Sequence, residues 1–144
     1  MVLSETDLSA FLDLLNKLET TNPPTVQEIA SVRLARERAT KIDYLSMDEA
    51  KIQRQIAEIQ RQASRPHALS FLQRPDADEH IKSIQNDLGA QVQIVSALLT
   101  EHRQFGELPA PHYSKRIGVI LRKEKRKDLS DRFQTAYNRH IVPY

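Results

Sequence analysis

The chain has 144 residues, with 21 Lys and Arg against 19 Asp and Glu and a net charge of +2 at pH 7. It contains no cysteine, which excludes disulfides, Cys-ligated zinc, iron–sulfur clusters and a thiol nucleophile, and fits a reducing compartment. The length suits one domain over residues 1–144, because elements packed side by side can bury one continuous core. Only 3 Gly occur against 7 Pro, and this scarcity favours an all-α fold over sheets, which need more frequent turns.

The first fifteen residues, MVLSETDLSAFLDLL, carry Glu5, Asp7 and Asp13 among their apolar positions and have no basic leader. They therefore match neither a signal peptide nor a membrane-spanning helix. No later stretch approaches the roughly 20 apolar residues that a span needs. We expect an intracellular protein, either cytoplasmic or nuclear.

Residues 4–21 are predicted to form the first helix. Ser4 and Asp7 give the S-x-x-D pattern of a capping box, in which a hydroxyl accepts a free amide hydrogen. The sequence Asn-Pro-Pro at 22–24 ends the helix, because proline has no amide donor and disfavours helical backbone in the residue before it. Apolar residues follow helical spacing at Leu8, Phe11, Leu12, Leu15 and Leu18.

Residues 25–64 are predicted to form a longer second helix, which begins with the capping box T-V-Q-E at Thr25. Apolar residues keep a three–four spacing almost to Pro66, with one disturbance over 44–49, where S-M-D-E is a second capping box. Either one helix about 60 Å long runs through this disturbance, or two helices meet near Ser46. We favour the single, coiled-coil-like helix, which is longer than its neighbours.

Within this helix, AKIQRQIAEIQRQA places Ile52, Ile56 and Ile59 four and three residues apart among long polar side chains. A three–four spacing is what any core helix shows, so these isoleucines fit an internal core. The apolar stripe is nevertheless as narrow as a coiled-coil seam, and its Gln and Arg flanks suit the rim of a contact between two helices. An interface with another protein, or with a second copy of the chain, is the alternative.

Residues 65–76 form a predicted linker, flanked by prolines, that contains Leu69, Phe71 and Leu72. An exposed linker rarely gathers three large apolar residues. We expect them to fold over the end of the bundle, with a docking loop for a partner as the alternative.

Two further helices are predicted, over residues 77–105 and 113–140. Asp76 or Asp78 caps the first of them, and Gly106 ends it as a C-cap. Apolar residues at helical spacing run through both segments.

The last of these helices contains the charged run R-K-E-K-R-K at 122–127. It either continues through this run, because Lys and Arg stems can cover apolar surface, or kinks there with Asp128 as a new N-cap. Segments of different length joined by short, Pro-rich connections predict an antiparallel bundle of three to four unequal helices.

No catalytic or metal-binding pattern is present. None of the five histidines has a Glu three residues before it, which excludes the di-iron type of bundle site. The chain also lacks H-E-x-x-H, a phosphate-cradling glycine loop, G-x-S-x-G and an EF-hand loop. His102 occupies an apolar-seam position, and we interpret it as a boundary side chain with a hydrogen-bonded ring nitrogen. We expect a protein without catalytic residues, metal or cofactor.

The best functional signal is a basic segment late in the chain. Residues 115–139 hold nine Lys or Arg against three acids, whereas residues 1–24 hold four acids and one Lys. As a helix, the segment presents a basic face that attracts phosphate groups by counterion release. A solvated surface and an acidic protein partner are the alternatives. The candidate anion-binding residues are Lys115, Arg116, Arg122, Lys123, Lys125, Arg126 and Lys127.

These observations predict a non-enzymatic helical interaction module, or a subunit of a larger assembly, that binds through the seam of the second helix. One alternative is a nucleic-acid-binding protein that uses the basic segment. Another, less favoured, is a membrane-active or signalling bundle whose first helix detaches onto an anionic membrane. The candidate protein-interaction residues are Ile52, Ile56, Ile59, Leu69, Phe71 and Leu72.

Overall fold

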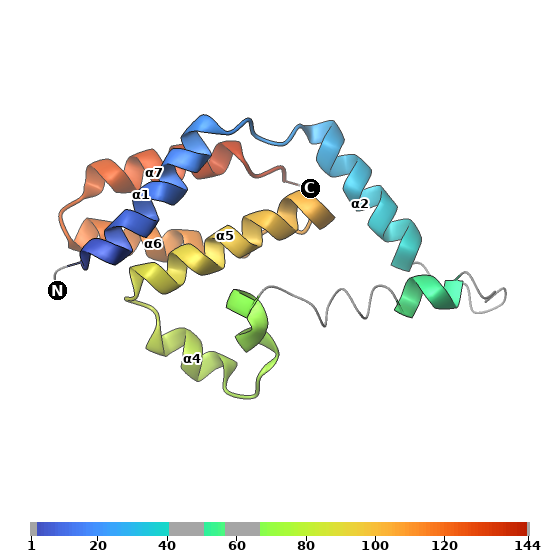
Figure 1. Ribbon diagram of the computed structural model, residues 1–144, viewed down its shortest axis with the longest axis horizontal. Coiled ribbons are helices and arrows are strands. Elements are labelled where there is room, and N and C mark those ends of the chain that lie inside the picture. Colours follow the sequence, from blue (N-terminus) through green and yellow to red (C-terminus); the bar gives the residue numbers. More distant parts are fainter. Residues whose placement is uncertain (1–2, 41–50, 57–66, 144) are drawn as a thin grey trace.

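The computed structural model describes residues 3–40, 51–56 and 67–143, and within these ranges every regular element is helical (Figure 1). The all-α prediction is therefore confirmed for the described part of the chain. Residues 51–56 are also helical. In chain order the remaining elements are α1 (Glu5–Thr20), α2 (Val26–Thr40), the 3-10 helix η1 (His67–Gln73), α4 (Ala77–Ser83), α5 (Leu88–Phe105), α6 (Pro111–Lys123) and α7 (Lys127–Arg139).

Helix α5 is the centre of the fold and contacts α1, α2, α6 and η1. Figure 1 shows α1, α6 and α7 gathered on one side of α5, with α2 beyond its C-terminal end. One cluster of buried apolar side chains unites α1, η1, α5, α6 and α7. At its centre the rings of Phe11 and Phe133 meet edge to face, with centroids 5.7 Å apart.

Helix α1 begins as predicted, since the Ser4 hydroxyl accepts the amide hydrogen of Asp7 at 3.1 Å. Phe11 and Leu15 on its apolar face are buried, whereas Leu12 is 41% exposed. A membrane-active role for this helix therefore requires core side chains to leave the protein interior.

The prediction of one helix over 77–105 is wrong, because the segment forms two helices, α4 and α5, separated by a turn. The turn contains Asp87, whose carboxylate accepts the amide hydrogen of Ala90 at 3.1 Å and so starts a new helix. Behind it, the side-chain amide of Gln91 donates to the carbonyl oxygen of Ile84 at 3.0 Å, which satisfies the end of the first helix. Asn-Asp directly before an apolar run is a cap signal, and here it overrides the continuous apolar spacing.

The prediction of one helix over 113–140 is also wrong. Helix α6 ends at Lys123 and α7 begins at Lys127, with Lys125 between them at a φ of 60°. The two helices pack on each other, so the middle of the charged run, 124–126, is a turn between them, and the run neither continues as one helix nor kinks at Asp128. Folding back brings the apolar faces of both helices onto the same core, which a straight helix through the run would prevent.

Helix α2 starts as predicted, with the Thr25 hydroxyl accepting the amide hydrogen of Glu28 at 3.0 Å. The helix is described to Thr40, and helical residues are described again at 51–56. The stretch where one long helix would be distinguished from two, 41–50, lies outside the described residues. The single helix over 25–64 therefore stays a prediction.

The predicted linker at 65–76 contains η1 and leads into α4. Leu69 and Phe71 are buried and Leu72 is half-buried against the core. Because η1 packs on α5, these side chains fold onto the rest of the protein, as expected. Buried Leu69 and Phe71 do not present the docking loop that was the alternative.

Candidate functional site

Most of the exposed large apolar side chains in the described ranges belong to two helical segments, α2 and residues 51–56, which we together call the arm. Four of six such side chains belong to it: Val26 is 70% exposed, Leu34 47%, Ile52 40% and Ile56 42%. Ile29, in contrast, is buried. Val26 and Leu34 are exposed while Ile29 is not, so α2 carries apolar residues toward solvent as well as toward the protein interior.

Arg33 fastens the arm to the rest of the protein. Its Nε donates to the carbonyl oxygen of Gly106 at 2.8 Å, and its two terminal nitrogens donate to the carbonyl oxygens of Val142 at 2.6 Å and Pro143 at 3.1 Å. The planar guanidinium thus joins α2 to the end of α5 and to the segment after α7. Gly106 has a φ of +74°, as the C-cap prediction implies, and a Cβ there would collide with the Arg33 stem.

A buried histidine holds the same segment from the other side. His102 Nε2 accepts the amide hydrogen of Val142 at 3.0 Å, so Nδ1 must carry the proton that it donates to the Glu107 carbonyl oxygen at 2.9 Å. Burial lowers the pKa of His102 below 6.5, and the nearby Arg33 and Arg103 lower it further, against the hydrogen bond to Glu107. His102 is therefore neutral, with both ring nitrogens hydrogen-bonded. This agrees with the interpretation from sequence, except that the ring lies in the interior rather than at its boundary.

The seven basic candidates do not share one side of a helix. Lys115 and Arg116 lie near the start of α6, and the other five lie in or beside the turn at 122–127, which we call the basic turn. Arg116 donates to the carbonyl oxygen of Gln85 at 2.9 Å and to the side chain of Asn86 at 2.8 Å, so it has a structural role at the start of α5.

Within the basic turn, the arginines and the lysines differ. Arg126 pairs with Asp128 at 3.2 Å, and Arg122 lies 3.4 Å from the Ser130 hydroxyl. Lys123, Lys125 and Lys127 are exposed, and no carboxylate of the described chain pairs with them. The turn is thus a small cluster of lysines open to solvent.

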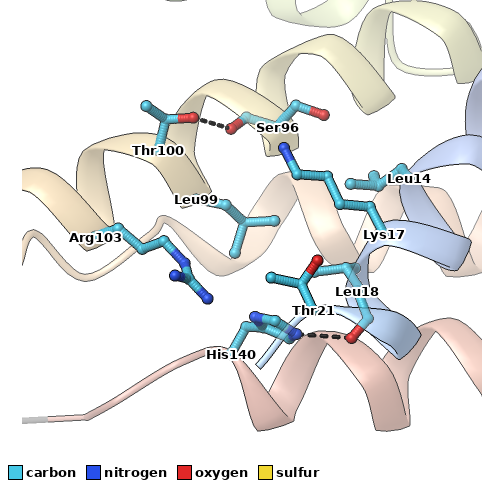
Figure 2. Close-up of a pocket in the computed structure, with 9 residues that line it drawn as sticks. All are labelled: Leu14, Lys17, Leu18, Thr21, Ser96, Leu99, Thr100, Arg103 and His140. Atoms are coloured by element: carbon cyan, nitrogen blue, oxygen red, sulfur yellow. Dashed lines mark hydrogen bonds between the residues drawn. The ribbon is translucent and has the colours of Figure 1, made fainter. Parts of the chain in front are cut away.

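A pocket lies between α1, α5 and the residue that follows α7 (Figure 2). Its volume is about 120 Å³. The apolar part of the wall is formed by leucines and the polar part by hydroxyl and basic side chains. The lining residues are Leu14, Lys17, Leu18, Thr21, Ser96, Leu99, Thr100, Arg103 and His140.

The pocket wall carries basic side chains and no carboxylate. Arg103 donates to the carbonyl oxygen of Asn22 at 2.5 Å, and Figure 2 shows its guanidinium directed toward His140. His140 Nε2 donates to the carbonyl oxygen of Leu18 at 2.7 Å. Burial lowers the pKa of His140, and Arg103 and Arg139 lower it further, so the ring is neutral near pH 7. The positive charge in the wall therefore belongs to Lys17 and Arg103.

Sequence reasoning did not find this pocket. Its two charged residues, Lys17 and Arg103, belong to different helices and form no motif along the chain. His140 had no role assigned to it beyond the expected end of a helix. Only the packing of α1 on α5 brings these side chains to one cavity.

Within the described ranges, no group of three or more His, Cys, Asp or Glu side chains is placed to hold a metal ion. The same part of the chain contains no helix long and apolar enough to cross a membrane. No protein-family model, curated protein or solved structure matches the chain.

Proposed function

We propose that this all-α protein is a non-enzymatic interaction module that binds a helix of a partner, either another protein or a second copy, through the exposed apolar side chains of the arm. One observation carries the proposal: four of the six exposed large apolar side chains in the described ranges lie on the arm. Exposed apolar residues that are concentrated in a small part of the chain, here two helical segments, are typical of protein-binding surfaces. Ile59, predicted on the same seam, lies outside the described residues.

The energy available from these side chains sets the size of the contact. Full burial of a Val, Leu or Ile side chain contributes about 2 kcal/mol, so four side chains that start about half exposed contribute about 4 kcal/mol. A micromolar complex needs about 8 kcal/mol. The partner helix must therefore also contact the Gln and Arg residues that flank the seam, as in the rim of a coiled coil.

The contacts that attach α2 to the rest of the protein hold its exposed apolar side chains in place for a partner. Arg33 makes three hydrogen bonds to backbone carbonyl groups, and Arg36 pairs with Glu107 at 2.6 Å. An element held in place before binding loses less conformational freedom when its partner arrives. The polar contacts hold α2 while leaving Val26 and Leu34 exposed.

Self-association is tested by light scattering coupled to size-exclusion chromatography between about 1 and 200 µM. If the partner is a second copy, the mass rises toward a dimer with concentration, and Ile56→Asp abolishes the rise. Gln53→Asp is the matched control, because it places the same charge on an exposed neighbour outside the seam. A rise that both variants abolish equally would reflect charge alone and would contradict the proposal.

If the wild-type protein is monomeric, a second test asks whether the arm binds another protein. A photo-reactive amino acid replaces Leu34 on the arm or, as the control, Lys123 on the basic turn, and cross-linked proteins from the source cells are identified by mass spectrometry. We expect a product that depends on Leu34 and disappears with Ile56→Asp. A monomer that gives no product from position 34 would overturn the proposal.

The second candidate function is binding of nucleic acid, and the observation that favours it is the cluster of unpaired lysines in the basic turn. Phosphate binding by Lys123, Lys125 and Lys127 predicts an affinity for oligonucleotides that falls steeply with salt. Fluorescence anisotropy of the Lys→Glu variants tests this, with Lys115→Glu as a control on the same helix α6 but away from the turn. An affinity that is insensitive both to salt and to these substitutions would exclude the role.

A further inference from the structure

We propose that the pocket between α1, α5 and His140 binds a small organic anion, with its acidic group at Lys17 and Arg103 and its apolar body against Leu14, Leu18 and Leu99. None of these residues belongs to the arm, so the inference is independent of the proposed function. It rests on the charge, the hydrogen-bonding groups and the size of the pocket.

Within the described residues, no carboxylate neutralises the charge of the pocket. Two other arginines at the surface do have acidic partners, in the pairs Arg36–Glu107 and Arg132–Glu19, each at 2.6 Å. Lys17 and Arg103 come from different helices to one cavity whose wall contains no Asp or Glu. An anion bound between them would form charge-assisted hydrogen bonds with both side chains.

The neutral groups of the wall complete a site for an anion. Thr100 already donates its hydroxyl hydrogen to the Ser96 carbonyl oxygen at 3.1 Å, whereas the hydroxyls of Ser96 and Thr21 make no such bond within the described chain. They remain as donors to anionic oxygens. His140 donates through Nε2, which leaves Nδ1 as an acceptor for a ligand hydroxyl or for a singly protonated phosphate.

The size and the apolar wall define the class of ligand. An engineered cavity of about 150 Å³ in another protein accommodates benzene, so a pocket of about 120 Å³ suits a ring or a short branched chain. The three leucines provide the apolar contact for such a group. Figure 2 shows the ammonium group of Lys17 beside Ser96 and the guanidinium of Arg103 beside His140, with Leu99 between them, so a ligand that contacts both basic groups lies across this leucine. A phosphate monoester or a carboxylate with a compact apolar body has this chemistry.

The test is a titration of the ¹⁵N-labelled protein, followed by NMR, with four probes: phenyl phosphate, benzoate, benzyl alcohol and inorganic phosphate. We expect phenyl phosphate or benzoate to shift amide signals at 17–21, 96–103 and 140 in a saturable way, and the tighter of the two identifies the acid. Both should bind at least about tenfold more tightly than benzyl alcohol or inorganic phosphate, each of which lacks one half of the ligand.

The variants separate the pocket from the rest of the basic surface. Lys17→Met should weaken binding about tenfold, the effect of one charge-assisted hydrogen bond, whereas Lys123→Met on the basic turn should leave it unchanged. Lys17 is exposed, so the variant is expected to fold; the NMR spectrum verifies this. Ser96→Ala, a smaller change in the same wall, provides a second variant with a weaker effect in the same direction.

Three results would overturn the inference. The first is the absence of saturable shifts at 10 mM phenyl phosphate and benzoate. The second is equal weakening by Lys17→Met and Lys123→Met, which means nonspecific attraction to a basic surface. The third is an affinity for benzyl alcohol or for inorganic phosphate that equals the affinity for phenyl phosphate. This result would mean that either the anionic or the apolar part of the pocket does not contribute to binding.

Discussion

Helices α1 and α2 both pack on α5, but they are attached in different ways. Helix α1 buries Phe11, Leu14, Leu15 and Leu18 and is part of the core. Helix α2 buries Ile29 and partly buries Val32, and Arg33 and Arg36 fasten it through polar contacts. Apolar packing tolerates small displacements, whereas hydrogen bonds depend on distance and angle. A helix held mainly by hydrogen bonds can keep apolar side chains exposed for a partner.

The largest loss of stability is expected for a substitution in the buried face of α1. Phe11→Ala removes a buried ring that meets Phe133 and should lower the free energy of unfolding by about 3–5 kcal/mol. Urea unfolding followed by circular dichroism measures this. Leu12→Ala is the control on the next residue, and because Leu12 is 41% exposed it should cost less than about 1 kcal/mol. Equal costs would mean that α1 is not attached through its core face.

A smaller loss of stability is expected when the hydrogen bonds that attach α2 are removed. Arg33→Met keeps most of the side-chain stem and removes three donors from the carbonyl groups of Gly106, Val142 and Pro143. Leaving such acceptors unsatisfied should cost about 2–3 kcal/mol, and hydrogen exchange should accelerate in α2 before α1. Arg33→Lys should not restore stability fully, because one ammonium cannot reproduce the planar fork. Arg38→Met, exposed on the same helix, is the control and should change little.

Low pH should lower the free energy of unfolding, because it weakens the contact between His102 and the segment after α7. The folded protein keeps the pKa of His102 below 6.5, whereas the unfolded chain takes up the proton near 6.5. The unfolded state therefore binds more protons, so stability is complete above about pH 7 and falls below about pH 6.5, by at most about 1.4 kcal/mol per pH unit for each such histidine. His140 contributes in the same direction, since its pKa is also lowered.

The measurement is urea unfolding between pH 5 and 8. His102→Gln should remove about half of the loss between pH 7 and 5, and the amide of Val142 should lose protection as the wild type is acidified, because a protonated Nε2 cannot accept its hydrogen. An unchanged pH dependence in the variant would show that His102 does not control the stability of this region.

The smallest loss of stability is expected when a polar contact of α1 at the protein surface is removed. Arg132 binds Glu19 through two hydrogen bonds, at 2.6 and 3.3 Å, but both side chains are partly or largely exposed. Glu19→Gln should therefore cost less than about 1 kcal/mol, and Asp13→Gln, an exposed position on the same helix, serves as the control. A cost comparable to that of Arg33→Met would mean that α1 also depends on polar contacts and would remove the contrast between the two helices.

Local signals in the sequence predicted the beginnings of α1 and α2 and the end of α5. Ser4 and Thr25 bind amide hydrogens three residues ahead, and Gly106 adopts a positive φ directly after the helix. Each of these signals acts within one turn of helix, so it is visible in a short stretch of sequence. Asp87 is a signal of the same kind, but the regular apolar spacing around it favoured an unbroken helix.

The sequence by itself determined that the described part of the chain is helical, where α1 and α2 begin and α5 ends, and that no cysteine chemistry is available. The tertiary structure decided that the chain turns within the run at 122–127, that Arg33 and His102 hold the segment after α7, and that Lys17, Arg103 and His140 share a pocket. These features depend on contacts between residues up to 122 positions apart. Periodicity along a helix shows which side is apolar, but it does not show which other helix that side will meet, because packing is decided by the shape and volume of all the faces together.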